Sequence, residues 1–193
     1  MSASRRRQGG FTLIEMMIVV LIIGVLSSLA FSYLDVDLTP ADLAESSSNL
    51  AREAGRRAAT GGPVRSDVAT ALGITSRSRV HVLPMSGTTR RIVVEQLKED
   101  PSPALTASWV EVGSVTVPAA VRLAGWRPTA DLTGGVGPSV TLADTAEVQI
   151  NCLPSGRCDA ATLYFQLPNN DSRLRARIVI LPLGGAPAVF QTW

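Results

Sequence analysis

The chain has 193 residues, of which 46% are hydrophobic and 18% charged, and this favours one globular domain plus an additional segment. Its formal net charge is only +2, and three of its positive charges are Arg5, Arg6 and Arg7 near the N-terminus. Without the first ten residues the net charge is −1, so the overall charge gives no reason to expect a nucleic-acid-binding protein.

The N-terminal segment combines a basic leader, residues 1–10, with an apolar run from Phe11 to Phe31. A helix of that length is about 31 Å long, enough to cross a hydrocarbon core of about 30 Å. We therefore expect a membrane-crossing helix over residues 11–34. Glu15 is the single charge in the run, and a carboxylate there costs roughly 2.5–3.5 kcal/mol on insertion scales, which makes Glu15 a candidate functional residue. The leader arginines predict a cytoplasmic N-terminus and a domain on the opposite side.

The stretch Gly10–Glu15 (GFTLIE) and the apolar run after it resemble the N-terminus of type IV prepilins and type II secretion pseudopilins. The resemblance implies that a prepilin peptidase cleaves after Gly10 and that Phe11 becomes the N-methylated first residue. It also implies that Glu15 pairs with the amine of Phe11 in a neighbouring subunit. The expected partners are other pilins or pseudopilins, the peptidase, an inner-membrane assembly platform and, before assembly, membrane lipid.

Three alternatives explain part of this segment. An ordinary secretory signal peptide has the small-x-small site that Ser28-Leu29-Ala30 provides, but Glu15 would interrupt its apolar region. A twin-arginine signal matches Ser4-Arg5-Arg6 but lacks the apolar residues expected after it. A plain single-span anchor accounts for the helix and leaves Glu15 unexplained.

The next predicted element is a helix over residues 39–60. Thr39 is the expected N-cap, with Pro40 at the first helical position and Asp42 three residues after the cap. Gly61-Gly62-Pro63 should end it. Its expected apolar face consists of Leu43, Ser47, Leu50, Ala54 and Ala58.

Residues 61–193 predict a β-rich domain, because short β-forming runs alternate with Gly/Pro/Asn/Asp turns. The expected strands are Val80–Leu83, Arg91–Leu97, Trp109–Val112, Val115–Leu123, Ser139–Ile150, Ala161–Leu167, Leu174–Leu181 and Ala188–Thr192. The fold class is therefore α+β, with a long N-terminal helix followed by an antiparallel sheet or sandwich. The resemblance implies that the domain over residues 61–193 is pilin-like and lies in the periplasm.

Several short segments are similar to the GspH/FimT family, which comprises minor pseudopilins of type II secretion and minor pilins of type IV pili. These segments are Ala51–Ala59 with Pro63-Val64, the Trp109 segment leading to Val117–Leu123, Pro154-Ser155-Gly156 and Arg177–Gly185. Where family members often have an apolar residue before the Pro-x-Gly turn, this chain has Cys152. The family implies a subunit that primes or caps a filament for protein export or pilus function.

The two cysteines, Cys152 and Cys158, flank a predicted turn. In an oxidising compartment a disulfide is the simplest interpretation, and two free buried thiols are the alternative. A metal site is not expected, because two cysteines and the single histidine, His81, do not supply four zinc ligands at standard spacing. His81 itself is expected to face solvent from a strand.

We expect neither an enzyme nor a cofactor, since no phosphate-binding loop, nucleophile elbow or zinc-protease motif occurs in the sequence. Arg173, Arg175 and Arg177 alternate along a predicted strand and so share one face. A solvated strand face is the ordinary interpretation. The alternative is a DNA-uptake minor pilin, since some FimT-like relatives bind DNA through such a basic surface.

Overall fold

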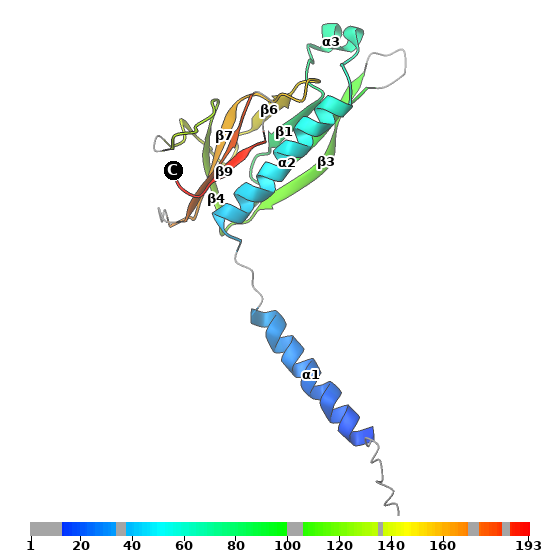
Figure 1. Ribbon diagram of the computed structural model, residues 1–193, viewed down its shortest axis with the longest axis vertical. Coiled ribbons are helices and arrows are strands. Elements are labelled where there is room, and N and C mark those ends of the chain that lie inside the picture. The colour runs from blue at the N-terminus through cyan, green and yellow to red at the C-terminus, as the bar shows by residue number, and fades with distance from the viewer. Residues whose placement is uncertain (1–12, 34–37, 100–105, 135–136, 170–173, 183–185) are drawn as a thin grey trace, which may run out of the picture. The chain divides into compact units, whose positions relative to one another are not determined.

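The computed structural model describes residues 13–33, 38–99, 106–134, 137–169, 174–182 and 186–193 (Figure 1). The chain divides into two compact units, residues 1–37 and 38–193. The first unit contains helix α1 and the second contains the remaining helices and all the described strands. The α+β fold class predicted from the sequence is thereby confirmed.

Helix α1 spans Leu13–Tyr33 and has Glu15 in its first turn. Two residues at the start of the predicted membrane segment, Phe11 and Thr12, and its last residue, Leu34, lie outside the described residues. In the part of the chain that the structure describes, no helix is long and apolar enough to cross a membrane.

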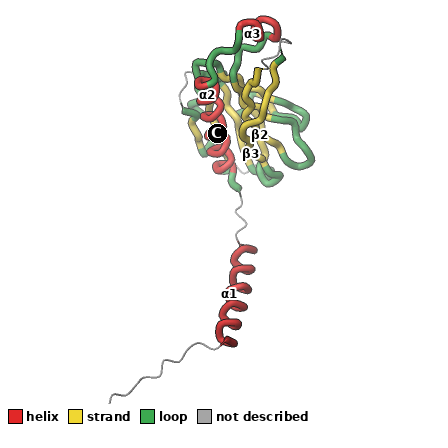
Figure 2. The backbone as a smooth tube through the Cα atoms, turned by 90° about the vertical axis from the view of Figure 1, so that its right-hand side faces the viewer, coloured by secondary structure: helices red, strands yellow, loops and turns green. Residues whose placement is uncertain are grey.

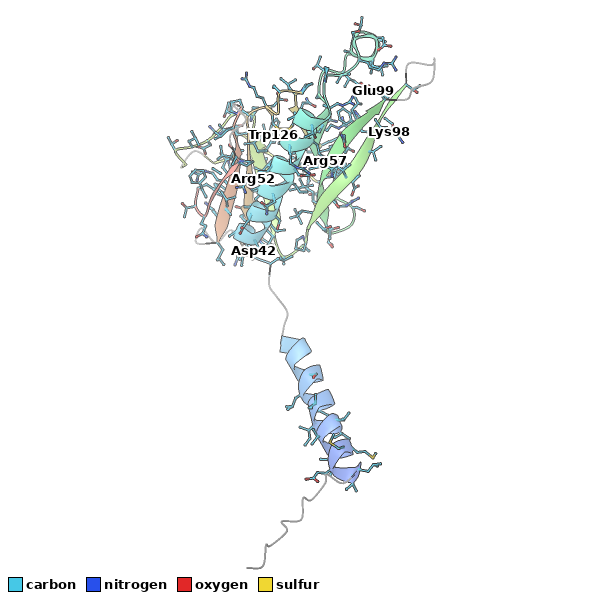
Figure 3. The ribbon with its side chains drawn as sticks, turned by 45° about the vertical axis from the view of Figure 1, so that its right-hand side comes forward. Asp42, Arg52, Arg57, Lys98, Glu99 and Trp126 are labelled. Atoms are coloured by element: carbon cyan, nitrogen blue, oxygen red, sulfur yellow. A yellow bond between two sulfur atoms is a disulfide. The ribbon has the colours of Figure 1, made fainter. Side chains whose placement is uncertain are left out.

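Helix α2 spans Pro40–Thr60 and begins with the predicted cap. The Thr39 hydroxyl accepts a 3.2 Å hydrogen bond from the Asp42 backbone N–H, and the Asp42 carboxylate accepts one of 2.9 Å from the Thr39 backbone N–H. These bonds satisfy two N–H groups that a helix start leaves without intrahelical partners, and a cap of this kind contributes about 1 kcal/mol. The bonds from Thr39 also lower the pKa of Asp42. Figure 3 shows Asp42 at this end of α2.

The packed face of α2 is built from small residues. Its buried residues are Pro40, Leu43, Ala44, Ser47, Ser48, Ala51, Ala54 and Ala58. Four of the five residues predicted for this face belong to that set, and Leu50 is half-buried beside it. Small side chains allow a close approach, as the 2.5 Å hydrogen bond from the Ser78 hydroxyl to the Ala54 carbonyl shows. Helix α3, Ser66–Leu72, was not predicted and contributes Val68 to the core.

Nine strands form two antiparallel sheets in the described residues (Figure 2). One sheet has the order β3-β2-β1-β6, and the other has the order β5-β4-β7-β8-β9. The strands are β1 Ser78–Val82, β2 Arg90–Glu99, β3 Ala107–Val117, β4 Arg122–Arg127, β5 Val140–Thr141, β6 Val148–Cys152, β7 Ala161–Gln166, β8 Arg175–Ile180 and β9 Ala188–Phe190.

Two predicted strands are wrong in their extent. The predicted run Val115–Leu123 is divided by a turn in which the Val121 N–H donates to the Pro118 carbonyl, so that β3 ends and β4 begins within it. The predicted run Ser139–Ile150 is divided between β5 and β6 by a turn at residues 143–146. In both places local β propensity continues through a turn that tertiary contacts fix.

One core joins α2 to both sheets, and Figure 1 shows α2 lying across strands of each. Ile92 and Val94 of β2 and Phe165 of β7 are fully buried in it. Burial of one such side chain contributes about 1.5–3 kcal/mol. Both faces of β8 are covered, because every residue from Ala176 to Ile180 is buried.

Candidate functional site

The segment with the strongest functional signal lies at the start of the chain, and the structure describes it from Leu13 onward. Gly10 and Phe11, the predicted cleavage and methylation positions, lie outside the described residues. Glu15 lies in the first turn of α1, where the positive end of the helix dipole favours a carboxylate. The sequence and the structure therefore both place this acid at the beginning of an apolar helix.

The large apolar side chains of α1 are exposed throughout the part whose burial is described. Leu13 is 79% exposed and Val25 is 53% exposed, and no apolar residue between them is buried. A soluble monomer rarely exposes a continuous apolar surface of this extent, so such a surface marks a site that another apolar phase or protein covers. These exposed apolar side chains lie on all sides of α1, so we expect the whole circumference of the helix to be covered by an apolar environment.

The predicted basic face of β8 is not a solvent-exposed stripe. Arg173 lies outside the described residues, and Arg175 stacks on the ring of Trp193 at 4.5 Å. Arg177 is only 3% exposed. Its Nε donates to the Asp131 carbonyl at 3.2 Å, and its Nη1 donates to the Thr192 carbonyl. The expectation of a solvated face is wrong for Arg177, and this residue is not accessible to DNA.

Asp131 is the centre of the buried polar cluster that contains Arg177. Its carboxylate accepts a 2.8 Å hydrogen bond from the Tyr164 hydroxyl and one of 3.0 Å from the Gly134 N–H. Burial alone would raise the pKa of Asp131. These donors, together with the positive charges of Arg177 and Arg127, outweigh it and lower that pKa. No sequence pattern predicted this cluster, because its members are separated along the chain and share no motif.

Cys152 and Cys158 form a disulfide in the structure, with a sulfur–sulfur distance of 1.99 Å. The turn between them packs on α2 at Gly55. A Cβ on Gly55 would lie 3.1 Å from the Gly156 carbonyl oxygen and 3.7 Å from Sγ of Cys158. Glycine at position 55 therefore permits the close approach of the disulfide-bonded turn to the helix.

His81 is not the solvent-facing residue that was predicted, since it is only 7% exposed. Its Nδ1 lies 3.1 Å from Oε2 of Glu95, and its Nε2 lies 2.6 Å from Oε1 of Glu147. The Glu147 pKa is lowered, first by the hydrogen bond from Gln149 and then by His81. The cluster connects β1 to its neighbours on both sides.

Within the described ranges, no group of three or more His, Cys, Asp or Glu side chains is arranged to hold a metal ion. The carboxylates around His81 lie on opposite sides of its ring and so do not converge on one point.

Comparisons with known proteins bear on the N-terminal segment first. The family model for the prokaryotic N-terminal methylation motif matches residues 5–31. The chain therefore has a prepilin-like N-terminus, as its sequence predicted.

A comparison with curated proteins found no significant match. Among solved structures, the chain is similar to the minor pseudopilin EpsH from the Type 2 Secretion System of Vibrio cholerae, with 15% sequence identity and a TM-score of 0.47. That similarity covers 79% of this chain and 97% of the other.

Proposed function

We propose that this chain is a minor subunit of a type II secretion pseudopilus or a type IV pilus, and that it belongs to the GspH/FimT group. The observation that carries the proposal is the methylation motif over residues 5–31, which coincides with the exposed apolar helix α1 and its acid Glu15. The GspH/FimT assignment is supported by the short sequence segments described above and by the order of a helix followed by antiparallel strands.

Processing is the first step of the proposed function. A prepilin peptidase in the inner membrane removes residues 1–10 by cleavage after Gly10, and Phe11 is then N-methylated. Removal of the leader takes away Arg5, Arg6 and Arg7 and leaves a cationic amine at Phe11. Before assembly, the apolar segment is held in membrane lipid, with the N-terminus cytoplasmic and residues 61–193 in the periplasm.

Assembly is the second step. The apolar surface of α1 packs against the corresponding helices of neighbouring subunits at the assembly platform, and Glu15 pairs with the Phe11 amine of one neighbour. At about 4 Å and an effective dielectric constant near 20, this attraction is about 4 kcal/mol, which is enough to offset the cost of a carboxylate in an apolar environment. The β domain then presents its surface near the filament tip, where the subunit primes or caps growth.

The Glu15→Ala variant of the full chain, expressed in cells that form the filament, tests this proposal. We expect normal cleavage, seen as a mature mass, together with a severe loss of the subunit from sheared filaments. Glu45→Ala is the matched control, because Glu45 is an exposed acid of α2 outside the apolar helix. Incorporation of the Glu15 variant at the wild-type level would contradict the assembly role of this acid.

A further inference from the structure

Strand β3 is the only long strand of the described residues whose outer edge is open. It has eleven residues and forms one end of the sheet order β3-β2-β1-β6. All its strand pairing is with β2, and no described backbone group outside β2 bonds to it. One side of its backbone therefore presents a row of N–H and C=O groups without partners among the described residues, which is a template for another strand.

The other three sheet edges are protected. Strand β6 is covered by the disulfide-bonded turn, because the Asp159 N–H donates to the Asn151 carbonyl at 2.8 Å and the Asp159 carboxylate accepts from the Asn151 N–H at 3.1 Å. Strands β5 and β9 have only two and three residues. Short or covered edges are the usual means by which proteins prevent strand addition, and β3 lacks both.

The composition of β3 also fits strand addition. Its sequence, ASWVEVGSVTV, is rich in β-forming residues and contains one charge, Glu111, and no proline or lysine. That charge is already paired with Arg91 of β2. A register shift opposite Val94 and Glu95 of β2 is the one irregularity of the pairing. A bulge twists an edge, but here the pairing with β2 continues on both sides of Val112, the one residue of β3 that the register skips.

The two faces beside the β3 edge differ in chemistry. On the face toward α2, Val110 is 42% exposed, and Leu50 of α2 lies against Gly113, at 3.3 Å from the position of a Cβ there. On the opposite face, Arg91 contacts Glu111 and Ser114. Trp109 lies on this opposite face as well, since it pairs with Leu97 of β2 and its ring lies under Arg79. An added strand therefore meets apolar groups on the face toward α2, and polar side chains together with one aromatic ring on the other face.

We propose that the β3 edge binds an extended segment of a different filament subunit, which joins the sheet as a fifth strand. This inference rests on the proposed function. A second copy does not fit, because antiparallel β3–β3 pairing is a two-fold contact that closes on itself, whereas a filament is built from contacts that repeat along its length. The other edges of a second copy are covered or too short to pair with eleven residues.

Site-specific photocrosslinking of the full chain in filament-forming cells tests the inference. A photoreactive residue replaces Val110 or Thr116 of β3, and Val140 of β5, which is 45% exposed, is the control position. We expect positions 110 and 116 to crosslink to one segment of one partner subunit, at sites about six residues apart, because paired strands advance in step. Position 140 should not give that product.

Two lysine variants make the test independent of any one substitution. Val110→Lys and Ser114→Lys each place a charge beside the edge, and each should reduce the crosslink from position 116 several-fold, whereas Val140→Lys should not. Crosslinks that are absent or scattered over several partners, in a chain that still enters filaments, would overturn the strand inference alone. A chain that never enters filaments would contradict the proposed function and would remove the partner that this inference requires.

Discussion

The hydroxyl of Tyr164 donates a 2.8 Å hydrogen bond to Oδ2 of Asp131, which lies 33 residues earlier in the chain. Burial and this bond to a carboxylate raise the pKa of Tyr164 to about 12. The bond links the centre of β7 to the loop that follows β4. That loop covers the side of β8 on which Arg177 lies. The polar cluster thus holds a loop rich in glycine and proline against the outer face of the sheet.

Tyr164→Phe should destabilise the domain. The variant keeps the ring but leaves a buried carboxylate with one donor fewer, and the cost of such a loss is about 1–3 kcal/mol. Urea unfolding followed by tryptophan fluorescence measures it, because all three tryptophans lie in residues 38–193. Thr141→Val, which removes an exposed hydroxyl, is the control and should change the unfolding free energy little. Equal midpoints for both variants would show that the Tyr164–Asp131 bond contributes nothing.

Asp131 should make the stability of the domain depend on acid pH. Its pKa is lowered in the folded protein, so protonation favours the unfolded chain. Its contribution is complete above the unfolded value of about 3.9 and is lost as the pH falls through the lower folded value. Asp131→Asn should remove this part of the acid destabilisation, although it lowers stability at neutral pH. The comparison is of unfolding free energies from pH 7 to pH 2, and parallel curves would refute the role of Asp131.

Arg177 should act as a structural residue. Arg177→Met removes the donor from the Asp131 and Thr192 carbonyls and should cost roughly 2–3 kcal/mol, measured by the same urea titration. Arg122→Met is the matched control, since Arg122 is exposed. DNA binding at low salt should not distinguish the two variants. A stable Arg177 variant that loses DNA binding would restore the DNA-uptake alternative.

The disulfide should stabilise the domain by about 2 kcal/mol, as the loop-entropy relation gives for a loop this short. The bonded cysteines are six positions apart in the sequence. Replacement of both Cys152 and Cys158 by serine should lower the unfolding free energy by this amount, and reduction of the wild-type chain should give a similar loss. If reduction has no effect on the variant but destabilises the wild type, the loss belongs to the disulfide. An unchanged wild-type midpoint under reduction would contradict the prediction.

Local signals predicted α2 well, because its start depends on neighbours in the sequence. Thr39, Pro40 and Asp42 form the cap without help from the rest of the fold, and the 3.6-residue period of small residues identified the packed face. The strand edges were harder to predict. Pro118 is a local signal for the turn that divides β3 from β4, but the valines on both sides of it led to the prediction of one continuous strand.

The environments of Arg177 and His81 were not predictable from the sequence for a different reason. Alternation along a strand separates its two faces but does not tell which face other segments cover. The outer face of β8 is covered by Asp131 and by residues near Trp193. The outer face of β1 is covered by Glu95 of β2 and by Glu147, which directly precedes β6. Only tertiary structure brings these groups together. The N-terminal motif, in contrast, is contiguous and was found directly.

The most direct test of the proposed account is the intact mass of the mature chain purified from cells that contain a prepilin peptidase. We predict a chain that begins at Phe11 with one added methyl group, and a Gly10→Trp variant that retains all ten leader residues. A mature wild-type chain that begins at Phe31, or one that keeps residues 1–10, would contradict the account.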